Sequence, residues 1–247
     1  MISVVVPLYN YACYIQENIE SILGQSIRDW EMIIVDDGSS DDPLSVIRPY
    51  LSKKIQYIRL DKNKGYGNAK NVGIQASKGE YIVVLDADDL LTHRSLEYRL
   101  RRLESTEFLW AHAKAYEFSG PKLTTFKYKR RKSIHRLEYI LKTGDNKDLW
   151  KSIHAQTVMV HREVYEKVGL YEVSLRSMGD KEMWARIINN VGPPIFVSKF
   201  VAHYRQHKNQ MHRSKYKLKR LSKYKKIVNS CIKRRKCGDL RDVVRLS

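Results

Sequence analysis

Three aspartates within four residues, Asp86, Asp88 and Asp89, directly follow an apolar run that ends at Leu85. Carboxylates this close repel one another, and a bound hard cation is the usual way to relieve that repulsion. Mg²⁺ or Mn²⁺ takes carboxylate oxygens and keeps open positions for a diphosphate group. The alternative is an acidic turn whose aspartates cap a helix beginning near Thr92. The spacing alone is compatible with both.

Two further stretches have residues suited to ligand binding. Asp36 and Asp37 follow an earlier apolar run and could accept a hydrogen bond from the N–H of a nucleobase such as uracil, or form an ordinary Asp-Gly turn. The glycine-rich stretch 65–70 ends in Lys70 and could bring backbone N–H groups and one cation close to phosphates. It is not a Walker A loop and it lacks the last glycine of the dinucleotide fingerprint, so a tight loop before a helix is an equal alternative.

The elements that must position these residues alternate along the first half of the chain. Short apolar runs predict strands at residues 2–6, 32–35, 55–60 and 81–85. Helical periodicity predicts helices at residues 15–24, 44–51 and 65–76. This alternation predicts a mainly parallel α/β sheet, in which ligands collect at the carboxyl ends of the strands. Both acidic clusters fall at such ends, so the sequence predicts one site there.

The second half of the chain is less regular and contains no internal repeat. Helices are expected at residues 96–103, 164–168 and 182–188, a strand at 196–204, and an exposed loop or hairpin at 122–132. Residues 1–207 are expected to form one domain, with a first half at 1–92 that contains the motifs above and a second half at 93–207. Residues 208–247 have apolar positions at helical spacing among many lysines and are expected to form a basic helical tail.

The net charge of +19 is concentrated near the carboxyl end of the chain. Residues 205–247 contain 16 Lys or Arg against 2 Asp or Glu, and a second basic patch runs through residues 127–132. Such a field attracts polyanions, which include nucleic acid, anionic lipid headgroups and charged glycans. A solvated helical face that keeps the protein soluble is the alternative.

Composition excludes several classes of protein. Hydrophobic residues make up 43% of the chain, which is enough for a sizeable core and argues against global disorder. We expect neither a membrane span nor a secretory signal peptide, because no suitable apolar stretch occurs. The scattered cysteines Cys13, Cys231 and Cys237 lack zinc-ligand spacing and suit a reducing compartment. The expected location is cytoplasmic, with a possible peripheral contact of the basic tail at the inner membrane surface.

Taken in order, the motifs identify a family. They are Val-Pro-Leu-Tyr-Asn at 6–10, Asp-Asp-Gly-Ser at 36–39, Asn-Lys-Gly at 63–65 with Ala-Lys-Asn-Val-Gly at 69–73, Lys-Gly-Glu-Tyr-Ile at 78–82, and Leu-Asp-Ala-Asp-Asp at 85–89. This order resembles the family 2 glycosyltransferases of the GT-A fold. Fainter matches continue through 164–172, 179–186 and 204–207, so the resemblance covers about residues 2–210 and excludes the tail.

The resemblance implies an inverting transferase that takes a sugar from a nucleoside diphosphate donor, with UDP favoured, and that uses Mn²⁺ or Mg²⁺. By the resemblance, the nucleotide pocket would be lined by Pro7, Tyr9, Asp37 and Lys70. Asp86 would approach the ribose or uracil, Asp88 would hold the metal, and His207 would complete the metal or diphosphate site. Residues 1–92 would form the nucleotide-sugar-binding half of the domain and residues 93–207 its acceptor-side half. Asp180 would be the catalytic base.

Two positions depart from the family pattern. Lys70 stands where the family usually has Arg, which changes a bidentate contact into a point-charge contact. The family has a Glu-Asp pair where this chain has Gly179 and Asp180, so Gly179 replaces the Glu. The role of that glutamate in acceptor binding is therefore in doubt for this chain. The alternative for Asp180 is an acidic residue stabilised by the helix macrodipole.

The acceptor is open at this point. A hydroxyl of a glycan, a lipid-linked glycan or another anionic acceptor suits the basic surface, and a modified DNA base is a less favoured case because nothing here reads base edges. Two other classes of protein are weighed against the transferase. One is a non-catalytic protein that binds a nucleotide sugar or a polyanion, and the other is a nucleotidyltransferase, which would show a glycine-rich basic loop after the first strand.

Overall fold

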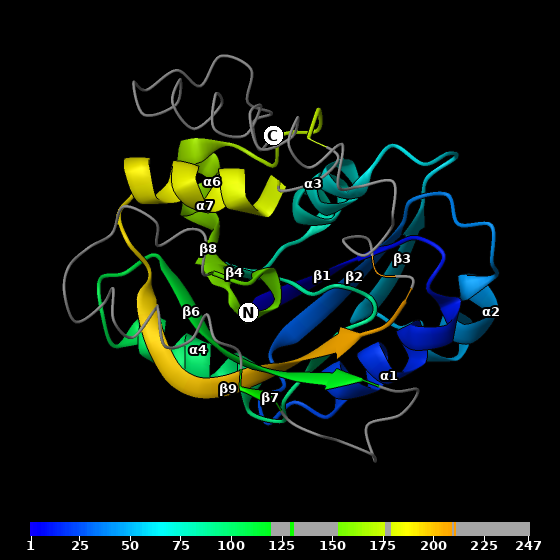
Figure 1. Ribbon diagram of the computed structural model, residues 1–247, viewed down its shortest axis with the longest axis horizontal. Coiled ribbons are helices and arrows are strands. Elements are labelled where there is room, and N and C mark those ends of the chain that lie inside the picture. Colours follow the sequence, from blue (N-terminus) through cyan, green and yellow to red (C-terminus); the bar gives the residue numbers. More distant parts are fainter. Residues whose placement is uncertain (120–128, 131–152, 176–178, 209, 211–247) are drawn as a thin grey trace.

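The computed structural model describes residues 1–119, 129–130, 153–175, 179–208 and 210 (Figure 1). Its strands are β1 (Ile2–Leu8), β2 (Trp30–Asp36), β3 (Ile55–Arg59), β4 (Tyr81–Val84), β5 (Leu90–Leu91), β6 (Trp110–Ser119), β7 (Lys129–Arg130), β8 (Met159–His161) and β9 (Ile195–Gln206). Its helices are α1 (Ala12–Leu23), α2 (Pro43–Ile47), α3 (Tyr66–Ala76), α4 (Ser95–Glu104), α6 (Arg162–Val168) and α7 (Gly179–Asn190). The predicted tail and most of the predicted 122–132 hairpin lie outside the described residues.

All the described strands join one sheet in the order β3-β2-β1-β4-β8-β6-β9-β5, with β7 paired to β6. The strands β3, β2, β1 and β4 are parallel, and β6 and β9 form a second parallel pair. The short strands β8, β7 and β5 are antiparallel to their neighbours. The predicted α/β architecture with a mainly parallel sheet is therefore confirmed.

Helices cover both faces of this sheet. The strand β1 shows how the sequence achieves this, because Val4 and Val6 belong to the core under α1 and α4, whereas Val5 packs with Ile74 of α3 on the opposite face. A strand buried on both faces has an uninterrupted apolar run, which is what residues 2–6 show. Figure 1 shows the two layers, with α1 and α4 on one side and α3, α6 and α7 on the other.

The helix α3 lies unusually close to the sheet because of Gly73. A Cβ at this position would lie 2.3 Å from Cγ1 of Val5 and 3.2 Å from Cγ2 of Val35. No side chain fits there, so glycine allows the helix axis to approach β1 and β2. This close approach sets the position of the first turns of α3. Tyr66 and Lys70, which lie in these turns, therefore face the ends of the strands.

Several predicted boundaries differ from the structure. The predicted 44–51 helix ends at Ile47 and continues as a 3₁₀ turn over Arg48–Tyr50, because Pro49 cannot continue the α-helical hydrogen bonds. The helix after the acidic turn begins at Ser95 rather than near Thr92, since the strand β5 intervenes. The ten-residue strand β6 was not predicted: its core-facing positions are alanines, which have low β-propensity.

Candidate active site

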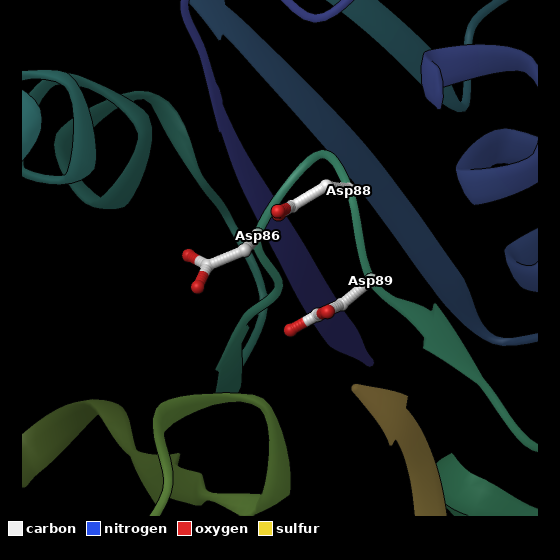
Figure 2. A group of neighbouring side chains, drawn as sticks. All are labelled: Asp86, Asp88 and Asp89. Atoms are coloured by element: carbon white, nitrogen blue, oxygen red, sulfur yellow. The ribbon is translucent and has the colours of Figure 1, made fainter. Parts of the chain in front are cut away.

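The acidic turn lies directly after β4, and Figure 2 shows the side chains of Asp86, Asp88 and Asp89 projecting from it. One carboxylate oxygen from each lies within 4.8 Å of the others. The turn is fixed by Asn18 of α1, whose Nδ2 donates to the carbonyl oxygens of Asp86 (3.0 Å) and Asp89 (2.7 Å). Because Asn18 is buried, the carboxylates are presented by a rigid backbone and not by a loose loop.

The three aspartates do not have the same surroundings. Asp89 is fully buried, and its Oδ1 accepts the backbone N–H of Arg205 at 2.9 Å. The guanidinium of Arg205 donates to the carbonyl oxygen of Asp88 (2.8 Å) and to the carboxylate of Glu17 (2.6 Å). Asp89 therefore ties the acidic turn to β9, which leaves Asp86 and Asp88 as the carboxylates best placed for a ligand.

His207 follows β9 directly and comes close to the acidic turn. Its Nε2 lies 2.9 Å from Oδ2 of Asp88, and its ring contacts the rings of Tyr11 and Tyr14 at centroid distances of 5.5 and 4.9 Å. The carboxylate oxygens of Asp86 and Asp88 suit Mg²⁺ or Mn²⁺, and the imidazole of His207 lies beside the carboxylate of Asp88. The residues therefore fit a divalent cation at this end of the site.

The carboxyl group of Asp86 lies close to other carboxylates. Burial and the neighbouring charge of Asp88 raise the pKa of Asp86 to about 7. The hydroxyl of Tyr66 donates a hydrogen bond to it, and burial together with Asp86 and Asp180 raises the pKa of Tyr66 well above its usual range. Tyr66 thus stays protonated, and a cation beside Asp86 would relieve the repulsion between the carboxylates.

A buried ion pair occupies the opposite end of the site. Lys70 of α3 is fully buried, and its ammonium contacts the carboxylate of Asp180, which lies in the first turn of α7 and is 24% exposed. The Nζ of Lys70 also lies 3.7 Å from the ring centroid of Tyr66 and 4.4 Å from that of Tyr171. The cation is therefore held between two aromatic faces and one carboxylate.

Asn71 explains why Tyr171 reaches this position. Its Nδ2 donates to the carbonyl oxygen of Tyr171, and its Oδ1 accepts the backbone N–H of the same residue, both at 2.8 Å. The two buried hydrogen bonds fasten the segment after α6 to α3, one residue beyond Lys70. In the Ala-Lys-Asn motif at 69–71, Lys70 thus supplies the cation, and the next residue, Asn71, holds the Tyr171 ring that contacts it.

These contacts form a connected path across the site. His207 contacts Asp88; Asp86 follows in the same turn and bonds to Tyr66; Tyr66 packs on Lys70, and Lys70 pairs with Asp180. The path runs from the end of β9 to α7 and joins residues that lie up to 141 positions apart in the sequence, from 66 to 207. The predicted metal residues and the predicted base therefore lie in one site at the carboxyl ends of the strands.

The residues predicted for the nucleotide end are placed differently. Pro7 is buried in β1 opposite Val35, and Tyr9, directly after the strand, is 45% exposed. The carboxylate of Asp37 is buried and accepts the backbone N–H groups of Lys64 and Gly65, each at 2.8 Å. Asp37 therefore braces the loop before α3 with both of its oxygens.

Asp36, the first residue of the Asp-Asp pair, has structural partners. Its carboxylate accepts hydrogen bonds from the N–H of Ser39 (2.8 Å), the hydroxyl of Tyr57 (2.6 Å) and the guanidinium of Arg59 (2.9 Å). Sequence reasoning did not find the roles of Arg205, Tyr66 and Tyr171. For the first two a signal exists, because Arg205 lies within the Tyr-Arg-x-His segment and Tyr66 within the glycine-rich stretch.

The fold and site together are those of a GT-A glycosyltransferase, and comparison with known proteins agrees. The sequence matches the family described as Glycosyl transferase family 2 over residues 3–169. The chain belongs to that family, and the enzyme class predicted from the sequence is confirmed.

In the described residues, no helix has the length and apolar character needed to cross a membrane.

Individual relatives agree in class. TuaG of Bacillus subtilis, assigned to teichuronic acid biosynthesis, is 29% identical over 220 residues, which cover 88% of this chain and 83% of TuaG. An uncharacterized glycosyltransferase of Rickettsia bellii is 39% identical over 112 residues, 45% of this chain but only 16% of that protein. The crystal structure of S. aureus TarS 1–349 in complex with UDP-GlcNAc has a TM-score of 0.72 at 19% identity and covers 93% of this chain and 66% of that one.

Proposed function

We propose that this chain transfers a sugar from a nucleoside diphosphate donor, with UDP as the nucleotide, to a hydroxyl group of an anionic glycan. The observation that carries the proposal is the placement of Asp180 in the same site as the acidic turn and His207. A cation site for the diphosphate and a separate, partly exposed carboxylate for the acceptor are the two parts that such a transfer requires. The complex of TarS with UDP-GlcNAc supports the choice of donor.

Different residues are proposed to act on the diphosphate, on the acceptor hydroxyl and on the nucleotide. A divalent cation bound by Asp88 and His207, beside Asp86, would neutralise the charge that develops on the leaving diphosphate. Asp180 accepts the proton of the acceptor hydroxyl while that oxygen forms its bond to the anomeric carbon and the bond to the diphosphate oxygen breaks. One displacement inverts the anomeric configuration and needs no covalent enzyme intermediate. The exposed ring of Tyr9, with Pro7 and Asp37, is proposed to border the nucleotide.

The acceptor is proposed to be an anionic polymer or lipid-linked glycan of the cell envelope. Two observations support this choice: the chain carries a net charge of +19, and its relative TuaG is assigned to the biosynthesis of a teichuronic acid. The tail at 208–247 and the patch at 127–132 would attract such an acceptor or an anionic membrane surface. This assignment places the enzyme in the cytoplasm, in peripheral contact with the inner membrane surface.

The donor is tested first. Thermal shifts are measured for the intact chain with a panel of UDP-, GDP-, CDP- and dTDP-sugars, each with and without Mn²⁺. We expect a shift that depends on Mn²⁺ and is largest with one UDP-sugar, because ligand binding to the folded state raises its stability. A chain that melts cooperatively but responds to no donor would contradict the proposal.

A further inference from the structure

We propose that Lys70 is a positioning residue for the base Asp180 and not a ligand of the donor phosphates. The inference rests on the proposed function, because it takes Asp180 as the base. It reverses the role expected for Lys70 from its place in the motif, where a cation near the glycine-rich loop would face the diphosphate.

Accessibility is the first reason. The side chain of Lys70 is fully buried, whereas the carboxylate of Asp180 is 24% exposed. A phosphate could reach the ammonium only by displacing Asp180 or an aromatic wall, but an acceptor hydroxyl can approach Asp180 directly. Lys70 therefore lies behind the carboxylate, on the side away from solvent.

The surroundings of the ammonium are the second reason. Its positive charge faces the carboxylate of Asp180 and the ring faces of Tyr66 and Tyr171, at 3.7 and 4.4 Å from their centroids. The same charge also counteracts the rise in the pKa of Asp86, and the aromatic faces stabilise the cation further. Because Tyr171 is fastened by Asn71 and Tyr66 by its bond to Asp86, the ammonium has a fixed position.

A fixed ammonium gives Asp180 a fixed orientation. Asp180 lies in the first turn of α7 and its side chain would otherwise rotate among several conformers. General-base catalysis requires the accepting oxygen within hydrogen-bond reach of the acceptor hydroxyl, and small misplacements are costly. The compact ammonium fits between two rings as a point charge, which offers a physical reason for Lys at a position where the family usually has Arg.

The test separates catalysis from donor binding. Lys70→Met keeps the length of the side chain and removes its charge, and Lys70→Arg restores a cation. We expect Lys70→Met to lower kcat by about 100-fold while the KM for the donor and the calorimetric donor affinity stay within about 2-fold of wild type. Lys70→Arg should recover at least about 10-fold of the lost kcat. Lys78→Met, which removes an exposed lysine just beyond the other end of α3, is the matched control and should match wild type.

A second comparison guards against a folding defect. Melting curves are recorded for each variant, and Lys70→Leu, which also lacks a donor toward Asp180, is assayed if Lys70→Met is unfolded at the assay temperature. In the Asp180→Asn background Lys70→Met should cause little further loss, because the two residues act as one unit.

The outcomes distinguish the inference from the proposed function. Full turnover by Asp180→Asn would refute the base and with it the proposed mechanism. An inactive Asp180→Asn together with a folded Lys70→Met, or Lys70→Leu, that has normal kcat would overturn only the inference. A Lys70 variant whose KM for the nucleotide-sugar donor rises about 10-fold or more at unchanged kcat would also overturn the inference, because Lys70 would then bind that donor.

Discussion

The imidazole of His207 lies against the carboxylate of Asp88, with Nε2 2.9 Å from Oδ2, although 119 residues separate the two in the sequence. Both side chains are largely shielded, at 12% and 10% exposure. A carboxylate and an imidazole in contact can share a proton in the absence of metal and can both become ligands in its presence.

We therefore predict that both residues contribute to metal affinity. Asp88→Asn should abolish Mn²⁺-dependent donor binding, and His207→Ala should weaken Mn²⁺ binding by about 10- to 100-fold because one ligand is lost. Calorimetric titration with Mn²⁺ measures both effects. Glu107→Gln, which removes an exposed carboxylate on the surface, is the control. If His207→Ala binds Mn²⁺ like wild type, the histidine is only a hydrogen-bond partner of Asp88.

Asn71→Ala should destabilise the protein, because it leaves the N–H and C=O of Tyr171 buried without their side-chain partners. Each unsatisfied buried group costs about 1–3 kcal/mol, so we expect a loss of about 2–5 kcal/mol in the free energy of unfolding. Urea denaturation gives this value. Asn68→Ala, in the first turn of the same helix, should have a smaller effect, and equal losses for the two variants would argue against a special role of Asn71.

The buried His112 should make the protein sensitive to acid. In β6 it is fully buried, neither ring nitrogen has a hydrogen-bond partner among the described residues, and burial lowers its pKa to about 3. The unfolded chain takes up a proton on this residue below about pH 6.5, but the folded chain does not until about pH 3. Stability is therefore lost as the pH falls from about 6.5 toward 3, by up to about 1.4 kcal/mol per pH unit.

His112→Phe should reduce this slope, because the residue no longer titrates and its ring still packs on Phe196. The free energy of unfolding is measured in urea at several pH values between 4 and 7. His93→Phe, at an exposed position, should leave the slope nearly unchanged. An identical slope for His112→Phe and wild type would show that other groups dominate the acid sensitivity.

Removal of residues 211–247 should weaken binding to anionic polymers or vesicles, because this segment holds most of the excess positive charge. The loss should be large at low salt and small at about 0.5 M salt, where charges are screened within a few ångströms. Co-sedimentation with vesicles that contain anionic lipid, and with an anionic polymer, measures it. Unchanged binding at low salt would mean that the tail does not dock the acceptor or the membrane.

The sequence predicted β1 to β4 and the helices between them, and it also predicted α4, α6, α7 and β9, but it missed β5, β6 and β8, for a physical reason. The strands β1 to β4 are buried on both faces, so their apolar runs are evident. The strand β6 carries alanines on its core side and polar or aromatic residues on the other, and the low β-propensity and small size of alanine hide its alternation. The short strands β5 and β8 are defined by their neighbours and not by their own residues.

For the site, the sequence predicted residues that the fold does bring together, but not what each one contacts. Asp86 and Asp88 were selected as site candidates because they follow the end of a strand, a property visible locally. The structural role of Asp89 depends on its hydrogen bond with Arg205, and the orientation of Lys70 depends on the ring of Tyr171. Because both partners are distant in the sequence, a local pattern shows neither. The sequence position of a lysine near the start of a helix does not indicate whether its side chain is exposed or buried.

The bond between the Asp89 carboxylate and the Arg205 backbone spans 116 residues, and it fixes the turn that carries the proposed metal ligands. A chain that has just left the ribosome as far as β5 already has the three aspartates but not the strand β9 that holds them in place. Contacts this distant in sequence form late, after most of the loop-closure entropy has been overcome. Mn²⁺ uptake by the refolding chain should consequently lag behind the burial of Trp30 at the start of β2.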